Sequence, residues 1–244
     1  MSNAHIVKSF DGELAQIENL ILEMGGIVET QITECISALT GRDEELALKV
    51  RRDDKAVDAL ETRIDDLTLR TLALRQPMAQ DLRSVICALK VASNLERIGD
   101  YSKNIAKRSI VLNSSDRLIS AEKTITRMGA MVQIMVADVL DAYVAKDVKM
   151  ADELLLRDEE VDHMHNTLFR ELLTYMMEAP HYITPGMHML FVAKNLERMG
   201  DHVTGIAEQI HYVATGSIPD DDRPKSDLTS QIAYSGMIRP PVPI

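Results

Sequence analysis

The acidic side chains with the most regular spacing lie in a seven-residue segment that occurs twice. The segment reads NLERIGD at residues 94–100 and NLERMGD at residues 195–201. In both copies a Glu precedes an Asp by four positions, and residues four apart lie on the same face of a helix. Each copy therefore offers two neighbouring carboxylates, which could hold a cation or accept hydrogen bonds.

A further pair of acids with the same spacing precedes each segment. If the helices that carry the two pairs pack antiparallel, all four carboxylates border one groove. Carboxylates that close raise one another's pKa unless cations bridge them, and all-oxygen ligand sets suit hard cations. We therefore predict a metal site in each half of the chain. The candidate ligands are Asp54, Asp58, Glu96 and Asp100 in the first half, and Asp158, Asp162, Glu197 and Asp201 in the second.

Two histidines distinguish the second set of acids from the first. His163 and His202 each directly follow a second-half acid, where the first half has Ala59 and Tyr101. Imidazole is a good ligand for transition metals, so the second site would favour iron, zinc or manganese more than the first. Both histidines are candidate additional ligands, although a structural role is open for each.

Acid pairs on a helix also have a plainer interpretation. They can form a solvated face or pair with a nearby base, and Arg97 and Arg198 lie between the acids of the two heptamers. Gly99 and Gly200 favour a site, because glycine inside a helix costs up to about 1 kcal/mol relative to alanine and is tolerated where another group approaches closely. Close helix packing would explain these glycines equally well.

One further motif raises the question of catalysis. Glu160 and His163 form a Glu-x-x-His sequence, and di-iron carboxylate bundles use two such motifs plus a Glu from each of two other helices. The first half has Ala59 in place of the histidine, so the second motif is missing. There is also no glycine-rich phosphate loop and no dinucleotide-binding fingerprint. We therefore expect a binding protein that is not an enzyme, with a metal-storage bundle or a metal-dependent enzyme as the alternative.

The acids belong to an internal duplication. An offset of 104 residues carries Leu14 to Leu118 and Asp54 to Asp158. An offset of 101 relates the two heptamers, so the second copy is three residues shorter somewhere between residues 76 and 184. Solenoid repeats have periods of roughly 20–50 residues. Two large repeats therefore fit better than an array.

Apolar residues recur every three or four positions through both halves, which is the helical period. We expect helices at about residues 11–41, 43–76 and 78–112, then at 118–143, 147–178 and 186–210, with a loop at 179–185. The predicted fold is all-α, with two tandem three-helix bundles at residues 1–112 and 113–215. Residues 216–244, where Pro, Asp and Ser dominate, are expected to form a flexible C-terminal tail.

Composition limits the partners and the compartment. The formal charge of −11 argues against nucleic-acid binding, which requires concentrated Lys and Arg. Cys35 and Cys87 both lie on apolar stripes, and nothing resembles a secretory signal or a run long enough to span a bilayer. We therefore expect a cytoplasmic protein with reduced thiols.

The chain resembles the PhoU family of bacterial phosphate-regulation proteins over nearly all of its length up to about residue 215. The resemblance rests on RQPMAQDLR at residues 75–83, on KNLERMGDH at residues 194–202, and on the doubled Glu/Asp-x-x-x-Asp pattern. The second half departs from the first where its third helix opens, because TPGMH at residues 184–188 replaces the fuller motif. The resemblance therefore does not imply that the two halves have the same function.

The resemblance implies a function that the spacing alone does not. Members of the family are tandem three-helix bundles, often homodimers, that bind metal ions through carboxylates matching the eight acids named above. They are adaptors without known catalysis, placed between the ATPase subunit of a phosphate ABC transporter and a membrane sensor histidine kinase. This implies a negative regulator of the phosphate-starvation response that modulates phosphate transport and meets membranes only through these complexes. Iron, manganese, magnesium and zinc are all open as the metal.

Overall fold

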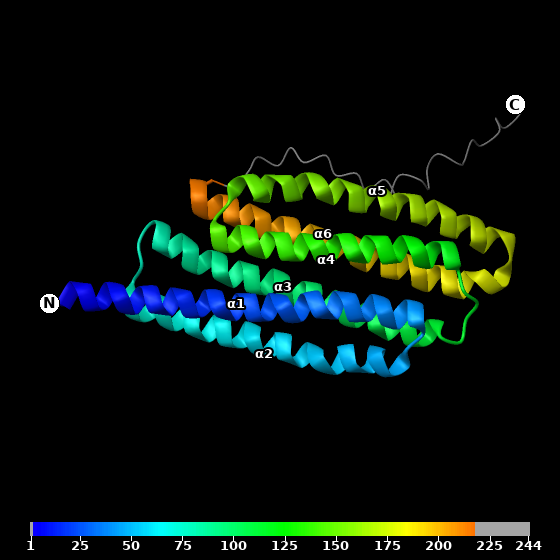
Figure 1. Ribbon diagram of the computed structural model, residues 1–244, viewed down its shortest axis with the longest axis horizontal. Helices are drawn as coiled ribbons and strands as arrows, with labels where there is room; N and C mark the ends of the chain where they lie inside the picture. The colour runs from blue at the N-terminus through cyan, green and yellow to red at the C-terminus, as the bar shows by residue number, and fades with distance from the viewer. Residues whose placement is uncertain (1, 218–244) are drawn as a thin grey trace, which may run out of the picture.

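The computed structural model describes the backbone of residues 2–217 and the side chains from residue 10 onward. This part of the chain is helical and contains no strand (Figure 1). The predicted tail lies outside the described residues from residue 218. The elements are α1 (Ser2–Gly41), α2 (Glu44–Arg75), α3 (Gln80–Leu112), α4 (Ile119–Ala145), α5 (Val148–Glu178), the short 3-10 helix η1 (Pro180–Tyr182) and α6 (Ile183–Thr215).

In each half, an aspartate in the loop between the first two helices determines where the second helix begins. Asp43 caps α2 by accepting a hydrogen bond from the backbone N–H of Leu46 at 2.9 Å. Asp147 caps α5 in the same way through Met150, at 3.1 Å. A side-chain oxygen at this position satisfies one of the N–H groups that have no partner within the helix. The two caps are 104 residues apart, so the duplication preserved the turn.

Three helix boundaries differ from the sequence-based expectation, and one of them is the end of α6 at Thr215 rather than near residue 210. Helix α1 begins at Ser2 rather than near residue 11. No Pro or Gly interrupts residues 2–10, so nothing in them stops the backbone hydrogen bonds from extending past the amphipathic part. The expected loop at 179–185 is shorter, because α6 already begins at Ile183 and contains Pro185 in its first turn. Proline is tolerated there because the first N–H groups of a helix have no partner within it.

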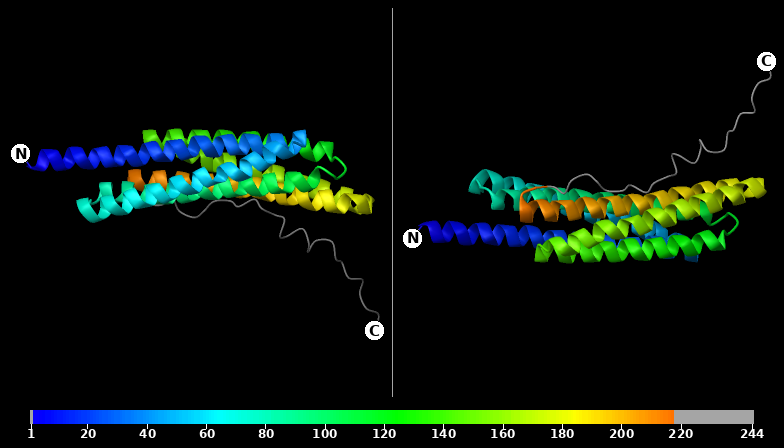
Figure 2. Two further views of the ribbon diagram at one scale, coloured as in Figure 1. Left: turned by 90° about the horizontal axis from the view of Figure 1, so that it is seen from below. Right: turned by 90° about the horizontal axis from the view of Figure 1, so that it is seen from above.

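The six α-helices of the described residues form two layers of similar construction. Helices α1, α2 and α3 pack on one another, and so do α4, α5 and α6. The two bundles lie side by side along their length, joined by contacts of α3 with α6 and of α1 with α4 (Figures 1 and 2). Their apolar side chains form one continuous core, which also holds Cys35 and Cys87 as free thiols. The predicted all-α fold of two tandem three-helix bundles is confirmed.

The contact between α1 and α4 is approximately two-fold symmetric. A Cβ added to Gly25 would overlap the side chain of Leu140, and one added to Gly129 would overlap that of Ile36. Gly129 is 104 residues after Gly25, and Leu140 is 104 residues after Ile36, so the two contacts use equivalent positions. Two surfaces that use the same positions reciprocally form an isologous contact. The halves are therefore related by a pseudo-two-fold rotation.

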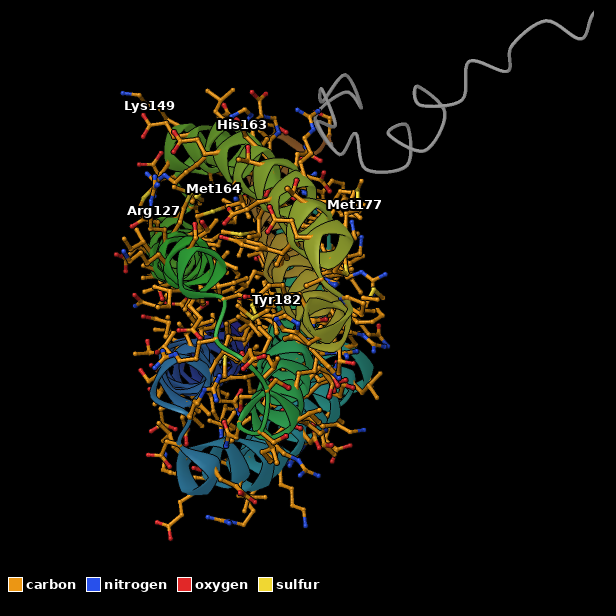
Figure 3. All side chains as sticks on the ribbon, turned by 90° about the vertical axis from the view of Figure 1, so that its right-hand side faces the viewer. Arg127, Lys149, His163, Met164, Met177 and Tyr182 are labelled. Carbon is orange, nitrogen blue, oxygen red and sulfur yellow. The ribbon has the colours of Figure 1, made fainter. Side chains whose placement is uncertain are left out.

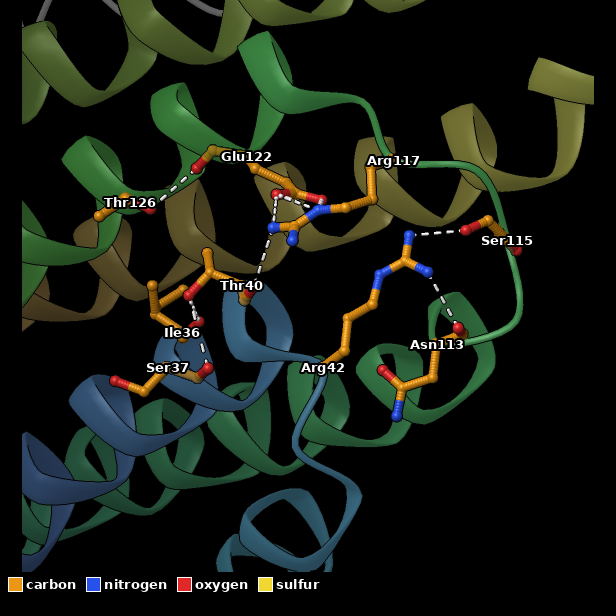
Figure 4. A network of polar contacts seen from close by, with 9 residues as sticks. All are labelled: Ile36, Ser37, Thr40, Arg42, Asn113, Ser115, Arg117, Glu122 and Thr126. Carbon is orange, nitrogen blue, oxygen red and sulfur yellow. Dashed lines mark hydrogen bonds and ion pairs between the residues drawn. The ribbon is translucent and has the colours of Figure 1, made fainter.

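Two arginines attach the linker between the halves to the end of α1 (Figure 4). Arg42 donates to the carbonyl oxygens of Asn113 and Ser115 at 2.9 and 2.6 Å. From the linker side, Arg117 donates to the carbonyl oxygen of Thr40 at 2.9 Å. The bonds to Asn113 and Thr40 satisfy carbonyl groups at helix ends, which have no partner within the helix. The linker is thus fixed to the first bundle at both of its ends.

Helix α4 qualifies the expectation that no segment could span a bilayer. It is long and apolar enough to pass that test by length and composition. Its buried face, which includes Met128, Val132, Met135 and Val139, faces the core of the described protein. Packing against the other helices therefore accounts for much of its apolar content.

Candidate functional site

The first acidic cluster joins α2 to α3 through a lysine. The side chain of Asp54 on α2 is only 3% exposed, and its Oδ2 accepts a hydrogen bond from Lys103 Nζ at 2.6 Å. The same ammonium group lies 3.1 Å from Asp100 Oδ1, one turn earlier on α3. Burial raises the pKa of Asp54, and the Lys103 hydrogen bond opposes this effect without cancelling it. The structure therefore brings Asp54 and Asp100 together as predicted, with a cation from the chain between them.

The other acids of this cluster face one another without such a base. Burial raises the pKa of Glu96 to about 7, with further upward contributions from the carboxylates of Asp100 and Glu61. The pKa of Glu61 is also raised, chiefly by burial and then by the charges of Asp65 and Asp58. The mostly exposed Arg97, whose Nε lies 3.5 Å from Glu96 Oε2, counters this repulsion. Protonation is thus one way in which the cluster limits its negative charge.

The second cluster contains a buried glutamate. The Glu197 side chain is 6% exposed, and Lys194 donates to its Oε1 at 2.7 Å. Its Oε2 is buried and has no hydrogen-bond partner among the described residues. Burial raises the pKa of Glu197, and the nearby charges of Asp201 and Asp162 raise it further. The charges of one acid on α5 and one acid on α6 therefore both act on Glu197.

The glycines of the two heptamers allow carboxylates to approach the helix backbone. A Cβ added to Gly200 would overlap Asp158 Oδ1. At Gly99 the added atom would lie 3.5 Å from Asp54 Oδ1 and 3.1 Å from Oε1 of the buried Gln31. Each glycine therefore makes room for the equivalent aspartate of the preceding helix. The sequence-based expectation that another group approaches closely at these positions is confirmed.

His163 and His202 lie apart, and each contacts a different set of side chains. His163 lies on the side of α5 that faces α4, where it lines a groove with Arg127 and Met164 (Figure 3). His202 Nδ1 donates to Asn94 Oδ1 of α3 at 2.8 Å, and its ring centroid is 5.6 Å from that of Tyr101. His202 would have to give up the bond to Asn94 in order to use Nδ1 as a ligand. Metal binding by either histidine stays a prediction.

The arrangement of the acids can be tested against what a metal ion requires. Among residues 10–217, no group of three or more His, Cys, Asp or Glu side chains is placed so as to hold a metal ion. The second half nevertheless has features that fit one, since Glu197 has a buried oxygen without a partner and Asp158 enters the space above Gly200. The first half fits less well, because Lys103 already lies between acids of α2 and α3.

Sequence reasoning missed four residues of these clusters. Glu61 lies three residues after Asp58 and therefore on the same helix face, so the spacing alone could have found it. Lys103 and Lys194 were not considered, although each is three residues from an acid of its own helix. Gln31 comes from α1, and no local spacing links it to Gly99.

Comparison with known proteins shows which family this chain resembles. The model of the PhoU domain matches residues 21–109 and again residues 125–210, once within each half. A phosphate-specific transport system accessory protein PhoU homolog from Caulobacter vibrioides is 48% identical over 93% of this chain and 99% of its own length. The homolog of the same name from Rhizobium meliloti is 44% identical over 95% of this chain and 98% of its own length.

Solved structures agree in fold. The crystal structure of PhoU from Pseudomonas aeruginosa has a TM-score of 0.81 and 38% identity, and the match covers 85% of this chain and all of that one. A phosphate transport system regulatory protein PhoU from Streptococcus pneumoniae also has a TM-score of 0.81, at 30% identity, and the match covers 86% of this chain and 99% of that one. The family model matches both repeats, the solved structures share nearly the whole described length, and the chain belongs to the PhoU family.

Proposed function

We propose that this chain is a negative regulator of the phosphate-starvation response that also modulates phosphate transport. The observation that carries the proposal is 48% identity, over almost all of both chains, to a protein named as an accessory of the phosphate-specific transport system. The chain acts by binding, as an adaptor between the ATPase subunit of the transporter and a sensor histidine kinase. It works in the cytoplasm as a homodimer and reaches the membrane through these partners.

The second acidic cluster supplies the proposed metal site of the adaptor. Asp158 and Asp162 come from α5, and Glu197 and Asp201 come from α6, so a cation shared among them would tie the two helices together. The unpartnered Glu197 Oε2 and the Asp158 carboxylate over Gly200 support this assignment. Carboxylate oxygens suit iron, manganese, magnesium and zinc, and the bound ion would supply positive charge that neutralises the acids. Linking α5 to α6 would stiffen the surface that the adaptor presents.

Expression of phosphate-starvation genes in phosphate-rich medium tests this function. Deleting the gene should derepress them, and the wild-type gene should restore repression. A variant of the second cluster should fail to restore it, whereas an equally charged variant on the exposed face of α5 should succeed. The test variant is Asp158→Asn, Asp162→Asn, Glu197→Gln and Asp201→Asn, and the control is Asp152→Asn, Glu153→Gln, Glu159→Gln and Glu160→Gln.

The outcomes separate regulation from metal binding. Unchanged expression in the deletion strain would contradict the regulatory proposal. Normal repression by the second-cluster variant would contradict a role for the metal site and leave the adaptor function standing. Recovery of the kinase and the transporter ATPase with the tagged protein, compared between the same two variants, would then show whether these acids contribute to docking.

A further inference from the structure

We propose that Lys103 takes the place of a metal ion in the first acidic cluster, where its ammonium group joins α2 to α3. The two halves are then unequal, because a cation of the chain joins α2 to α3 in the first half, and the second half has a threonine at the equivalent position. The inference concerns the clusters themselves and does not depend on the role in phosphate regulation.

The contacts of Lys103 are those expected of a bridging cation. Its Nζ lies 2.6 Å from Asp54 Oδ2 on α2 and 3.1 Å from Asp100 Oδ1 on α3. Charge-assisted N–H···O bonds usually measure about 2.7–2.9 Å, and they are roughly twice as strong as neutral ones. The other oxygen of Asp54, Oδ1, lies 3.5 Å from the point that a Cβ on Gly99 would occupy, so it packs over the backbone of α3. Asp54 therefore contacts α3 through Lys103 with one oxygen and packs over Gly99 with the other.

The electrostatics of Lys103 agree with this role. A lysine has an unperturbed pKa of about 10.4, so its ammonium group carries its charge at physiological pH. A divalent cation placed between the same two carboxylates would meet this ammonium group a few ångströms away. Like charges at such distances repel, and more strongly in a partly buried site than in water. Metal binding between Asp54 and Asp100 must therefore displace the lysine.

The equivalent position in the second half has no such group. The offset of 101 carries Lys103 to Thr204, a buried residue whose hydroxyl donates to the carbonyl oxygen of Asp201 at 2.8 Å. The lysine that the second half does have, Lys194, contacts Glu197 at the other end of the cluster, where the first half has Ser93. The halves therefore place their ammonium groups at different ends of an otherwise repeated set of acids.

Binding of Mn²⁺ to the full-length protein tests the assignment. The protein is purified without chelator or affinity metal, and bound Mn²⁺ is counted by elemental analysis and followed by electron paramagnetic resonance. Lys103→Thr, which copies Thr204, should bind about one Mn²⁺ more per chain than the wild type, because it exposes the carboxylates to the ion. Lys107→Thr, an exposed lysine one turn further along α3, is the matched control and should bind as the wild type does.

Two variants in the wild-type background keep the test decisive even if Lys103→Thr folds poorly. Asp100→Asn should leave the Mn²⁺ stoichiometry unchanged, whereas Asp201→Asn at the equivalent position should reduce it. A loss of Mn²⁺ in Asp100→Asn would overturn the proposal, because a metal would already occupy the first cluster. A folded Lys103→Thr protein that gains no Mn²⁺ would overturn it as well. Derepression of phosphate genes is not used in this test, so the proposed function can fail or hold separately.

Discussion

Tyr101 and His202 occupy the same position in the two repeats, and their rings lie 5.6 Å apart across the contact between α3 and α6. Glu29 and Gln133 show the same relationship between α1 and α4, since Gln133 Nε2 donates to Glu29 Oε2 at 3.3 Å over a separation of 104 residues. Residues that meet their own counterparts must lie near the pseudo-two-fold axis. The axis therefore passes through both contacts that join the halves.

Acidification should weaken this contact through His202. Burial lowers the pKa of His202; the charge of Asp201 opposes this effect, and the charges of Arg97 and Arg198 add to it. The folded protein therefore binds the proton less readily than the unfolded chain, and its free energy of unfolding should fall as the pH drops below about 6.5. Denaturant titrations at pH 7.5 and 5.5 should show a smaller loss in His202→Gln than in the wild type. The exposed His181→Gln is the control, and an equal loss in all three proteins would contradict the prediction.

In metal-free protein, Glu96 should make the free energy of unfolding depend on pH in the opposite direction. Its pKa of about 7 lies above that of an unfolded glutamate, so its contribution to stability is complete below about pH 4.5 and is lost as the pH rises through 7. Each pKa unit corresponds to about 1.4 kcal/mol, and solvent screening reduces the total to about 1–3 kcal/mol. Glu96→Gln should be more stable than the wild type at pH 8 and similar to it at pH 4.5. The exposed Glu160→Gln should show no such gain.

The buried Asp54 and the half-exposed Lys103 should respond differently to removal of their partner. Lys103→Met leaves a carboxylate that is 3% exposed without its cation, and should lower the free energy of unfolding by about 2–4 kcal/mol. Asp54→Asn leaves an ammonium group that is 40% exposed and can turn to water, so its cost should be about 1 kcal/mol. Chemical denaturation of both single variants and the double variant measures the difference. Equal costs for the two single variants would show that burial does not decide the energetics here.

Neighbouring glycines on α1 offer a sharp test of the contact between the halves. Gly25 lies beneath Leu140, whereas a Cβ on Gly26 would meet nothing within 4 Å. Gly25→Leu should separate α1 from α4 and cost about 1–3 kcal/mol. Gly26→Leu should instead stabilise the helix by about 0.5–1 kcal/mol, since glycine is a poor helix former. Thermal unfolding distinguishes the two, and a similar change in both would mean that α1 does not pack as described.

Much of the fold followed from local patterns in the sequence. The apolar period predicted the helices, and Asp43 and Asp147 marked two starts because capping depends on neighbouring residues alone. The early start of α1 and the inclusion of Pro185 in α6 were missed. Amphipathic spacing does not report where backbone hydrogen bonds end, and a proline is compatible with a first turn.

The candidate site could be predicted only where the geometry was local. Acids four residues apart were correctly placed on shared faces, and the repeated glycines correctly indicated close approach. The bridge from Lys103 was missed because a long, flexible side chain can reach several acids, and tertiary packing selects among them. The partner of His202 was beyond such reasoning, since Asn94 lies 108 residues away in the sequence.

The pseudo-two-fold axis has a consequence for the origin of the chain. A protein with a single repeat could bind a second copy of itself through the surface that now joins the halves. Each residue near the axis would then have met the same residue of the other copy. Fusing the two copies makes that encounter intramolecular, at an effective concentration in the millimolar range for short flexible connections. It also lets each copy mutate alone, so that a lysine could arise beside the acids of one copy while the other kept a threonine.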